Sequence, residues 1–163
     1  MKNFFSKKSD VTALQKEALD KLRLHFVFNS LNAIRYLIKK QPDVAYDMVY
    51  DLATYLRGCS ESIVEETPVS VEEELSFAKA YARLEEVQRS RLKVDWQAQS
   101  IEGYVKRGSV YSVIEQMLKQ EVFAVKEERI LLVKTDCEKA LICVSVVETG
   151  TTVEIPIQYK EEK

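Results

Sequence analysis

The sequence predicts an α+β fold in which helices come first and a small unit of strands and helices follows. Two observations carry this prediction. No glycine or proline falls between Asp10 and Gln41, so one long helix can form there. From about residue 92 onward, short runs rich in β-branched residues alternate with turn residues, as is typical of strands. An apolar share of 46% is enough to build a core for one compact domain or two small ones.

Apolar residues recur at spacings of three and four along the first predicted helix, as they do in helix bundles: Leu24, Val27, Leu31, Ile34 and Ile38. The same rhythm follows Pro42, at Ala45, Val49, Leu52, Leu56, Cys59 and Ile63. The short connection "KKQPD" makes the two helices antiparallel neighbours. Because a pair of helices buries little surface by itself, we expect this helical hairpin to form a four-helix bundle by dimerisation.

The remaining elements follow from local signals. After the turn "EETPVS", Ser70 and Glu73 have the spacing of a capping box, which starts a third helix running to about Arg91. The segment "LKVDWQAQ" alternates like a strand, "SVYSVIEQMLKQEVFAV" is helical, and "RILLVKT", "ALICVSVVE" and "TTVEIPIQY" have strand composition. We therefore divide the chain into a dimerisation hairpin (residues 1–66), a connecting helix (67–91) and a small α+β unit (92–163).

Charge and cysteine content narrow the function classes. Lysine plus arginine (24) nearly balances aspartate plus glutamate (26), which argues against nucleic acid or an anionic membrane and favours protein partners. The three cysteines, Cys59, Cys137 and Cys143, lack CxxC spacing and fit reduced thiols in a cytoplasmic protein. One histidine makes a zinc site improbable. No apolar run has the length of a signal peptide core or a membrane span, so we expect a soluble protein.

The only histidine lies in the stretch "LHFVFNSLNAI". At about 100° per residue, His25, Asn29, Asn32 and Tyr36 share one helical stripe, offset from the apolar seam. The amides of Asn29 and Asn32 can orient a ring nitrogen or a bound anion. The pattern alone allows two interpretations, a reactive centre and a structural polar residue on a packed helix.

The segment "HFVFNSLN" resembles the histidine box of LytS-type sensor histidine kinases. The resemblance continues through "DLATYLR" and "VSVEEELSFAKAYARLEEVQRSRLKVDW" and covers about the first hundred residues. It implies that His25 is the phosphoacceptor and that the partners are a second copy of the chain and a response-regulator receiver domain or a sensor kinase. The family usually has asparagine and proline before the histidine, whereas Arg23 and Leu24 stand here, so the helix should continue without a proline kink.

The same resemblance implies an α/β-sandwich ATPase domain of the GHKL type in the second half. Where the family reads like "LVENAIKHG", this chain reads "VIEQMLKQE": Glu115 is kept, Gln116 replaces the magnesium-binding asparagine and Glu121 replaces the glycine. The nucleotide lid is replaced by what reads as a tight turn at residues 148–150. We therefore expect a truncated, degenerate domain that binds no ATP and no other cofactor, with Glu115, Gln116 and Gln120 as ordinary helix residues.

Four functions remain open at this point. The first is a dimeric histidine phosphotransferase acting through His25, similar in plan to the sporulation-phosphorelay phosphotransferase. The second is a non-enzymatic pseudokinase that regulates a kinase or a response regulator by binding it. The third is an active histidine autokinase, and the fourth is a helical adaptor unrelated to phosphotransfer.

Overall fold

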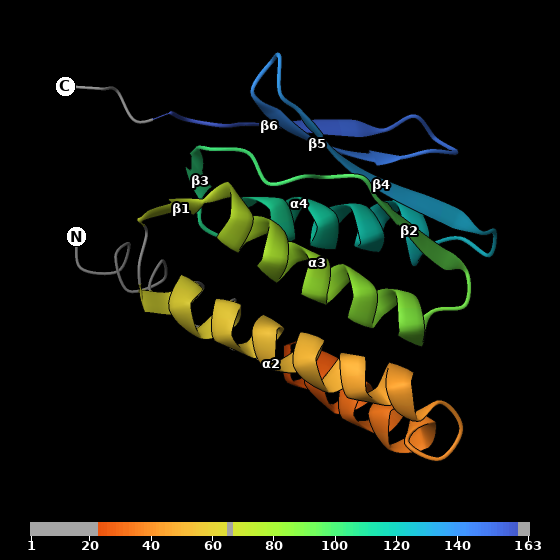
Figure 1. Ribbon diagram of the computed structural model, residues 1–163. Coiled ribbons are helices and arrows are strands. Elements are labelled where there is room, and N and C mark those ends of the chain that lie inside the picture. Colours follow the sequence, from red (N-terminus) through yellow and green to blue (C-terminus); the bar gives the residue numbers. More distant parts are fainter. Residues whose placement is uncertain (1–22, 65–66, 160–163) are drawn as a thin grey trace, which may run out of the picture.

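The computed structural model describes residues 23–64, apart from the side chains of 62–64, and residues 67–159. The predicted helical residues from Asp10 to position 22, and the side chain of the seam position Ile63, lie outside this described part. The predicted α+β class is confirmed: helices are combined with a four-stranded and a two-stranded sheet. Figure 1 shows three layers, with the larger sheet on one side, α3 and α4 in the middle and the N-terminal helices on the far side.

The N-terminal layer consists of a first helix at residues 23–37 and of α2, Pro42–Val64, joined by a short turn. We call them the helix pair; they run side by side in Figure 1, and the rings of Phe26 and Tyr55 meet at 4.9 Å. Within one chain, the first helix buries a face that includes Ser30 and Ile34. Three members of the predicted apolar seam instead stay exposed: Leu24, Leu31 and Ile38.

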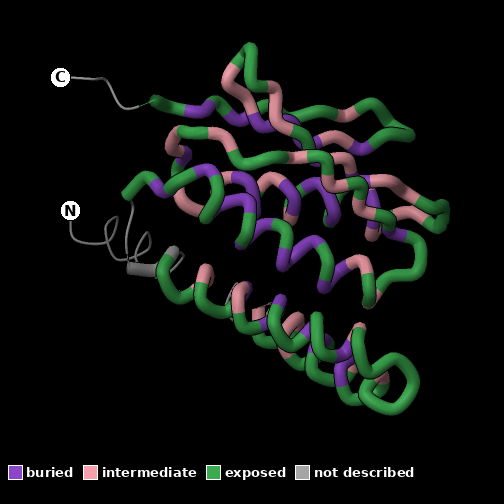
Figure 2. The backbone as a smooth tube through the Cα atoms, viewed as in Figure 1, coloured by how far each residue is buried: buried purple, intermediate pink, exposed green. Residues whose placement is uncertain are grey.

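The middle layer is built around α3, Val71–Gln88, which is buried along most of its length (Figure 2). Its predicted cap is confirmed, because the Glu73 backbone N–H donates to Ser70 Oγ at 3.2 Å. The helix ends at Gln88 rather than near Arg91, since Arg89 is already extended (φ −130°, ψ 99°) and leads into the next strand. Two short strands, β1 (Pro68–Ser70) and β3 (Tyr104–Lys106), pair antiparallel beside its start.

The larger sheet has the order β2-β4-β5-β6, with ranges Leu92–Trp96, Arg129–Asp136, Leu141–Val146 and Thr152–Pro156. The pair β2 and β4 is parallel and the other two pairs are antiparallel. These strands match the predicted strand segments. The predicted tight turn between the last two strands is also present, with Gly150 at φ 72°, a conformation that glycine adopts without steric cost.

One further helical segment packs against β5 and β6, and its character changes along its length. It begins as α4, Ser109–Met117, and continues as the π-helical turn η1, Leu118–Val122. The Phe123 backbone N–H accordingly donates to the Leu118 carbonyl, five residues back, at 2.9 Å.

A buried carboxylate holds the start of α4. Gly108 caps this helix with φ 74° and has no side chain to accept the free N–H groups. Glu74 of α3, only 1% exposed, accepts from the backbone N–H groups of Gly108, Val110 and Tyr111 at 2.7, 2.9 and 3.3 Å. Burial raises the pKa of Glu74, and the three backbone hydrogen bonds partly offset that shift. Next to it, the Arg107 guanidinium pairs with Glu73 at 2.9 Å.

Candidate functional site

The first helix presents three faces. One face packs on α2 and α3 through the phenyl ring of Phe26 and the side chains of Ser30 and Ile34. A second face is apolar and exposed, with Leu24, Phe28, Leu31 and Ile38. The third is polar and exposed, with His25, Asn29, Asn32 and Tyr36. His25 therefore lies on a surface separate from both apolar faces.

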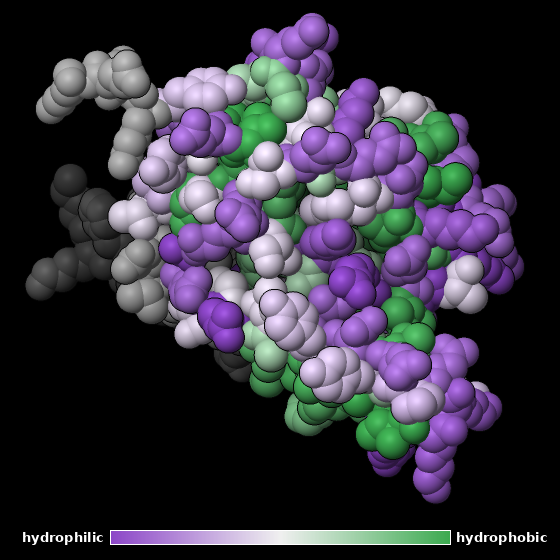
Figure 3. Space-filling model, in the orientation of Figure 1, coloured by the Kyte–Doolittle hydropathy of each residue, from purple (hydrophilic) through white to green (hydrophobic). Residues whose placement is uncertain are grey.

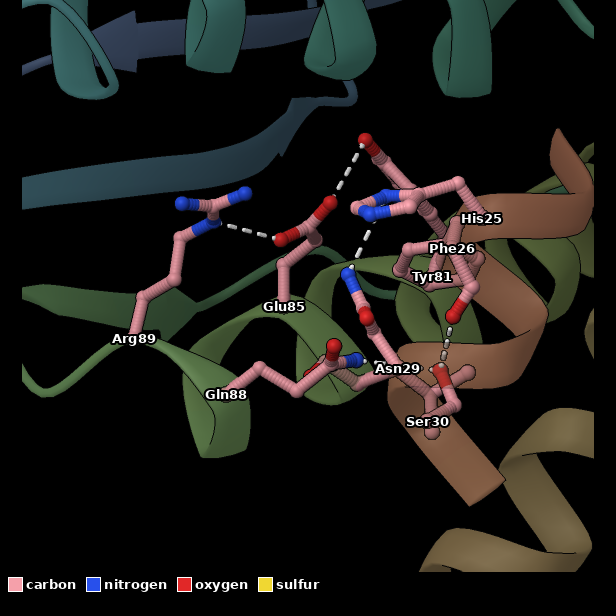
Figure 4. A network of polar contacts seen from close by, with 9 residues as sticks. His25, Phe26, Asn29, Ser30, Tyr81, Glu85, Gln88 and Arg89 are labelled. Carbon is pink, nitrogen blue, oxygen red and sulfur yellow. Dashed lines mark hydrogen bonds and ion pairs between the residues drawn. The ribbon is translucent and has the colours of Figure 1, made fainter. Parts of the chain in front are cut away.

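His25 makes one hydrogen bond within the described part of the chain. Its Nδ1 lies 3.2 Å from Asn29 Nδ2, one helical turn further on (Figure 4). Because an amide nitrogen can only donate, Nδ1 accepts in this arrangement and the proton of a neutral ring lies on Nε2. A half-turn of the Asn29 amide presents Oδ1 instead, which places the proton on Nδ1 and leaves a lone pair on Nε2.

The other predicted orienting residue does not reach the ring. Asn32 is exposed on the same stripe, two turns from His25, and no hydrogen bond joins the two side chains. Tyr36, further along, contacts Lys40 through its hydroxyl and ring instead. The structure therefore brings together His25 and Asn29 but not Asn32.

Below the exposed pair, the first helix is hydrogen-bonded to the end of α3. The Ser30 hydroxyl is fully buried and donates to the Phe26 carbonyl at 3.0 Å. It accepts from Gln88 Nε2, also at 3.0 Å, and the same amide nitrogen donates to the Leu84 carbonyl at 3.0 Å. Figure 4 shows this chain of contacts running from α3 to the histidine-bearing helix.

A second set of contacts extends from the last turns of α3 toward η1. Glu85, 4% exposed, accepts from the Tyr81 hydroxyl at 3.2 Å and from Arg89 Nε at 2.8 Å. Burial raises the pKa of Tyr81, with a further contribution from the Glu85 charge, so this hydroxyl remains a donor. The Arg89 guanidinium lies over the ring of Phe123, 3.6 Å from its centroid, where η1 ends.

Sequence reasoning missed the residues that support the pair. Ser30 does carry a signal in the sequence, because it shares the helical phase of the apolar residues Phe26 and Ile34, which the structure packs on its core. Gln88 gives no such signal, since it is 58 positions from its partner in sequence. Arg89 likewise acquires its contact with Phe123 only through the tertiary fold.

The predicted degenerate positions lie on α4 and η1. Gln116 and Gln120 are exposed. Glu115 is half-buried, accepts from the Tyr111 hydroxyl at 3.1 Å and pairs with Lys119 Nζ at 3.1 Å. Through Tyr111, whose ring contacts that of Tyr55, Glu115 is linked to the aromatic residues between α4 and α2.

Two glutamates hold the turn between β5 and β6 in place. Glu148 accepts from the backbone N–H of Ile130, with its two oxygens at 3.1 and 3.0 Å. Thr151, on the other side of the turn, donates its hydroxyl hydrogen to Glu121 of η1 at 3.2 Å. The turn thus packs down onto η1, on the side of the sheet that carries α4.

Within 23–64 and 67–159, no three or more histidine, cysteine or acidic side chains gather as a metal site. None of the helices in these ranges combines the length and the apolar character needed to cross a membrane. The three cysteines are free thiols.

Comparison with known proteins adds to this geometry. A sequence model of the family described as Histidine kinase matches residues 9–92, just over half of the chain. Sensor histidine kinase YpdA of Escherichia coli (strain K12) is 34% identical over 79 residues, 48% of this chain and 13% of that protein. Sensor protein LytS of Enterococcus faecalis (strain ATCC 700802 / V583) is 25% identical over 147 residues, 88% of this chain and 24% of that protein. The chain thus spans less than a quarter of either relative.

Proposed function

The chain belongs to the LytS-type histidine kinase family and derives from the sensor kinases of two-component signalling, and from this premise we propose that it is a histidine phosphotransferase. In this proposal His25 accepts a phosphoryl group from the phosphorylated aspartate of a receiver domain and passes it on. The observation that carries the proposal is the exposed His25–Asn29 pair on a helix face that takes no part in packing.

The chemistry needs only the ring and its neighbour. With the Asn29 amide turned so that Oδ1 accepts from Nδ1–H, the Nε2 lone pair attacks phosphorus. The P–O bond to the donor aspartate breaks, the aspartate leaves as a carboxylate, and a P–N bond to His25 forms. The ring keeps its proton on Nδ1, so no separate base is required, and catalysis comes chiefly from positioning. The magnesium ion that neutralises the transferring charge would belong to the receiver.

Contacts in the second half of the chain support a donor outside the chain. The turn at residues 148–150 is too short to form a lid over phosphates, and Glu148 and Glu121 hold it against the fold. Gln116 is too long to take over the ligand geometry of an asparagine without adjustment. We propose that residues 92–163 form a degenerate ATPase-like domain that binds neither nucleotide nor metal.

We also propose that the chain acts as a homodimer, with residues 1–66 forming a four-helix bundle and residues 67–91 connecting it to the second domain. Like the first helix, α2 leaves side chains exposed that a second copy could cover: Tyr46, Val49, Ala53 and Leu56. Figure 3 shows apolar residues at the surface along the lower edge of the molecule, where the helix pair lies. A second copy that covers these side chains would leave the polar face of His25 open to a receiver domain.

Phosphoryl transfer from receiver domains tests the proposal. Receiver domains of response regulators, loaded with labelled phosphate, are mixed with the full chain, and the product is tested for acid-labile, base-stable phosphate. We expect labelling of the wild-type chain and none of His25→Gln. Asn29→Leu, which cannot hold Nδ1–H, should be labelled more slowly. No label on the wild-type chain from any receiver would refute the phosphotransferase function.

A binding regulator without phosphotransfer is the second candidate, favoured by the exposed apolar residues of the helix pair. In that case His25→Gln would leave binding to a kinase or a receiver unchanged. An active autokinase is the third candidate. Saturable, magnesium-dependent ATP binding by the full chain, measured by calorimetry, would support the autokinase and contradict the proposed loss of the nucleotide site.

A further inference from the structure

The exposed pair on the first helix is followed, residue by residue, by anchored side chains. His25 precedes Phe26, whose ring contacts Tyr55 at 4.9 Å and Tyr81 at 5.2 Å. Asn29 precedes Ser30, which is fully buried and hydrogen-bonded on both sides. Each member of the His25–Asn29 pair is thus followed directly by a residue whose side chain is fixed by tertiary contacts.

The two anchors differ in what they can fix. Aromatic contacts hold Phe26 against neighbouring helices, but apolar packing is non-directional and tolerates small rotations. The hydrogen bonds of Ser30 are directional: Gln88 Nε2 donates to its hydroxyl oxygen, and its hydroxyl hydrogen is donated to the Phe26 carbonyl. Because Gln88 Nε2 is also bonded to the Leu84 carbonyl, its position is fixed by α3 itself.

We propose that Gln88 is a positioning residue for His25, which fixes the rotation and the axial position of the first helix on α3 through Ser30. The inference rests on the proposed function, because position matters only if a partner must reach the ring. Each residue along a helix changes the direction of a side chain by about 100° and its height by about 1.5 Å. A displacement of about 1 Å at a reacting centre can slow a reaction by about two orders of magnitude.

The last turn of α3 is held from its other side by the second half of the chain. Arg89, the residue after Gln88, binds Glu85 at 2.8 Å and lies over the Phe123 ring at the end of η1. The end of η1 is therefore connected, through the last turn of α3, to the helix that carries His25. Phe123→Leu, which removes the aromatic face, should have a smaller effect of the same kind as Gln88→Ala.

Nuclear magnetic resonance of the full chain tests the positioning directly, because His25 is the only histidine and gives one set of imidazole signals. In Gln88→Ala we expect these signals to shift or broaden, and amide hydrogen exchange in the first helix to quicken by about tenfold, consistent with loss of one hydrogen bond. Ser30→Ala removes the same bond from the other side and should give the same result. Gln97→Ala, which removes an exposed side-chain amide that bonds Asp95 two residues away, is the matched control and should change neither.

Two phosphoryl donors distinguish an effect on the position of His25 from an effect on the reactivity of its ring. Phosphoramidate, whose P–N bond breaks with loss of ammonia as the new bond to the ring forms, needs no docking and should label Gln88→Ala within about twofold of wild type. Transfer from a loaded receiver domain should fall by about tenfold. An equal fall with both donors would overturn the positioning role, since the bond would then act on the ring itself.

The outcomes distinguish this inference from the proposed function. If the imidazole signals and the amide exchange rates of Gln88→Ala match those of wild type, Gln88 does not position His25, whether or not the chain accepts phosphate. If they change in both Gln88→Ala and Ser30→Ala while no receiver labels the wild-type chain, the positioning stands and the phosphotransferase function fails.

Discussion

The helix pair and the part of the chain from α3 onward differ in how many of their large apolar side chains are exposed. Among the residues that the structure describes, thirteen large hydrophobic side chains are exposed: nine lie between positions 24 and 56, and four lie after α3 begins. Figure 2 shows the contrast, with buried residues along α3 and mostly exposed ones on the outer side of α2. Contiguous exposed apolar residues mark surfaces that bind partners. Within one chain, the helix pair thus leaves large apolar side chains exposed, whereas the described residues from α3 onward bury most of theirs.

This comparison also separates where stability and function are expected to lie. Substitutions from α3 onward should change the free energy of unfolding, because buried polar groups there have specific partners. Substitutions on the outer faces of the helix pair should change association or phosphotransfer with little effect on folding. The following variants test that separation, beginning with the largest expected effect.

Replacement of Glu74 should cause the greatest loss of stability. Glu74→Ala leaves three backbone N–H groups at the start of α4 without their acceptor, in a buried place that water reaches poorly. We expect a loss of about 3 kcal/mol in the free energy of unfolding, measured by urea denaturation. The control is Glu72→Ala, an exposed first-turn residue that should lose about 0.5 kcal/mol or less. Equal losses in the two variants would show that the cap contributes nothing.

Gly58 tests the contact between the two regions. A Cβ atom added here would lie 2.2 Å from Phe77 Cδ2, so α2 and α3 would have to separate or the ring would have to move. Gly58→Ala should therefore cost about 2 kcal/mol, despite the better helix propensity of alanine. Combining it with Phe77→Leu should cost less than the sum of the two single losses. Stabilisation by Gly58→Ala alone would contradict the close approach of the two helices.

What the sequence could predict depends on how local the cause is. The family resemblance is confirmed, as are the Ser70 cap and the strand segments, because each rests on neighbouring residues. The Glu74 cap could not be predicted, since Gly108 offers no capping side chain and its acceptor is 34 positions away. The seam through Leu31 was predicted to pack, yet Leu31 is exposed within one chain, while the neighbouring row that contains Ser30 faces the core. The sequence offers both rows on the same helix, and the tertiary contacts with α2 and α3 select one of them.

A charge on the apolar face of the first helix should change association but not folding. Leu31→Glu places a carboxylate among exposed apolar side chains, so the unfolding free energy at low protein concentration should shift by no more than about 0.5 kcal/mol. If two copies pair through this face, sedimentation equilibrium should show a dimer for wild type and a monomer for the variant. Lys39→Glu, at the exposed turn, is the control and should remain dimeric. A wild-type monomer at high concentration would contradict the four-helix bundle.

The smallest change in stability is expected at His25. The ring is exposed and its one described hydrogen bond is to Asn29, which is exposed as well, so His25→Gln should unfold within about 0.5 kcal/mol of wild type. The contrast with Glu74 is informative because both side chains are polar and both lie on helices that pack against a neighbouring helix. One is buried with three partners and holds the fold, while the other is presented outward by Phe26 and Ser30. A large loss of stability in His25→Gln would make the histidine a structural residue and remove the main support for phosphotransfer.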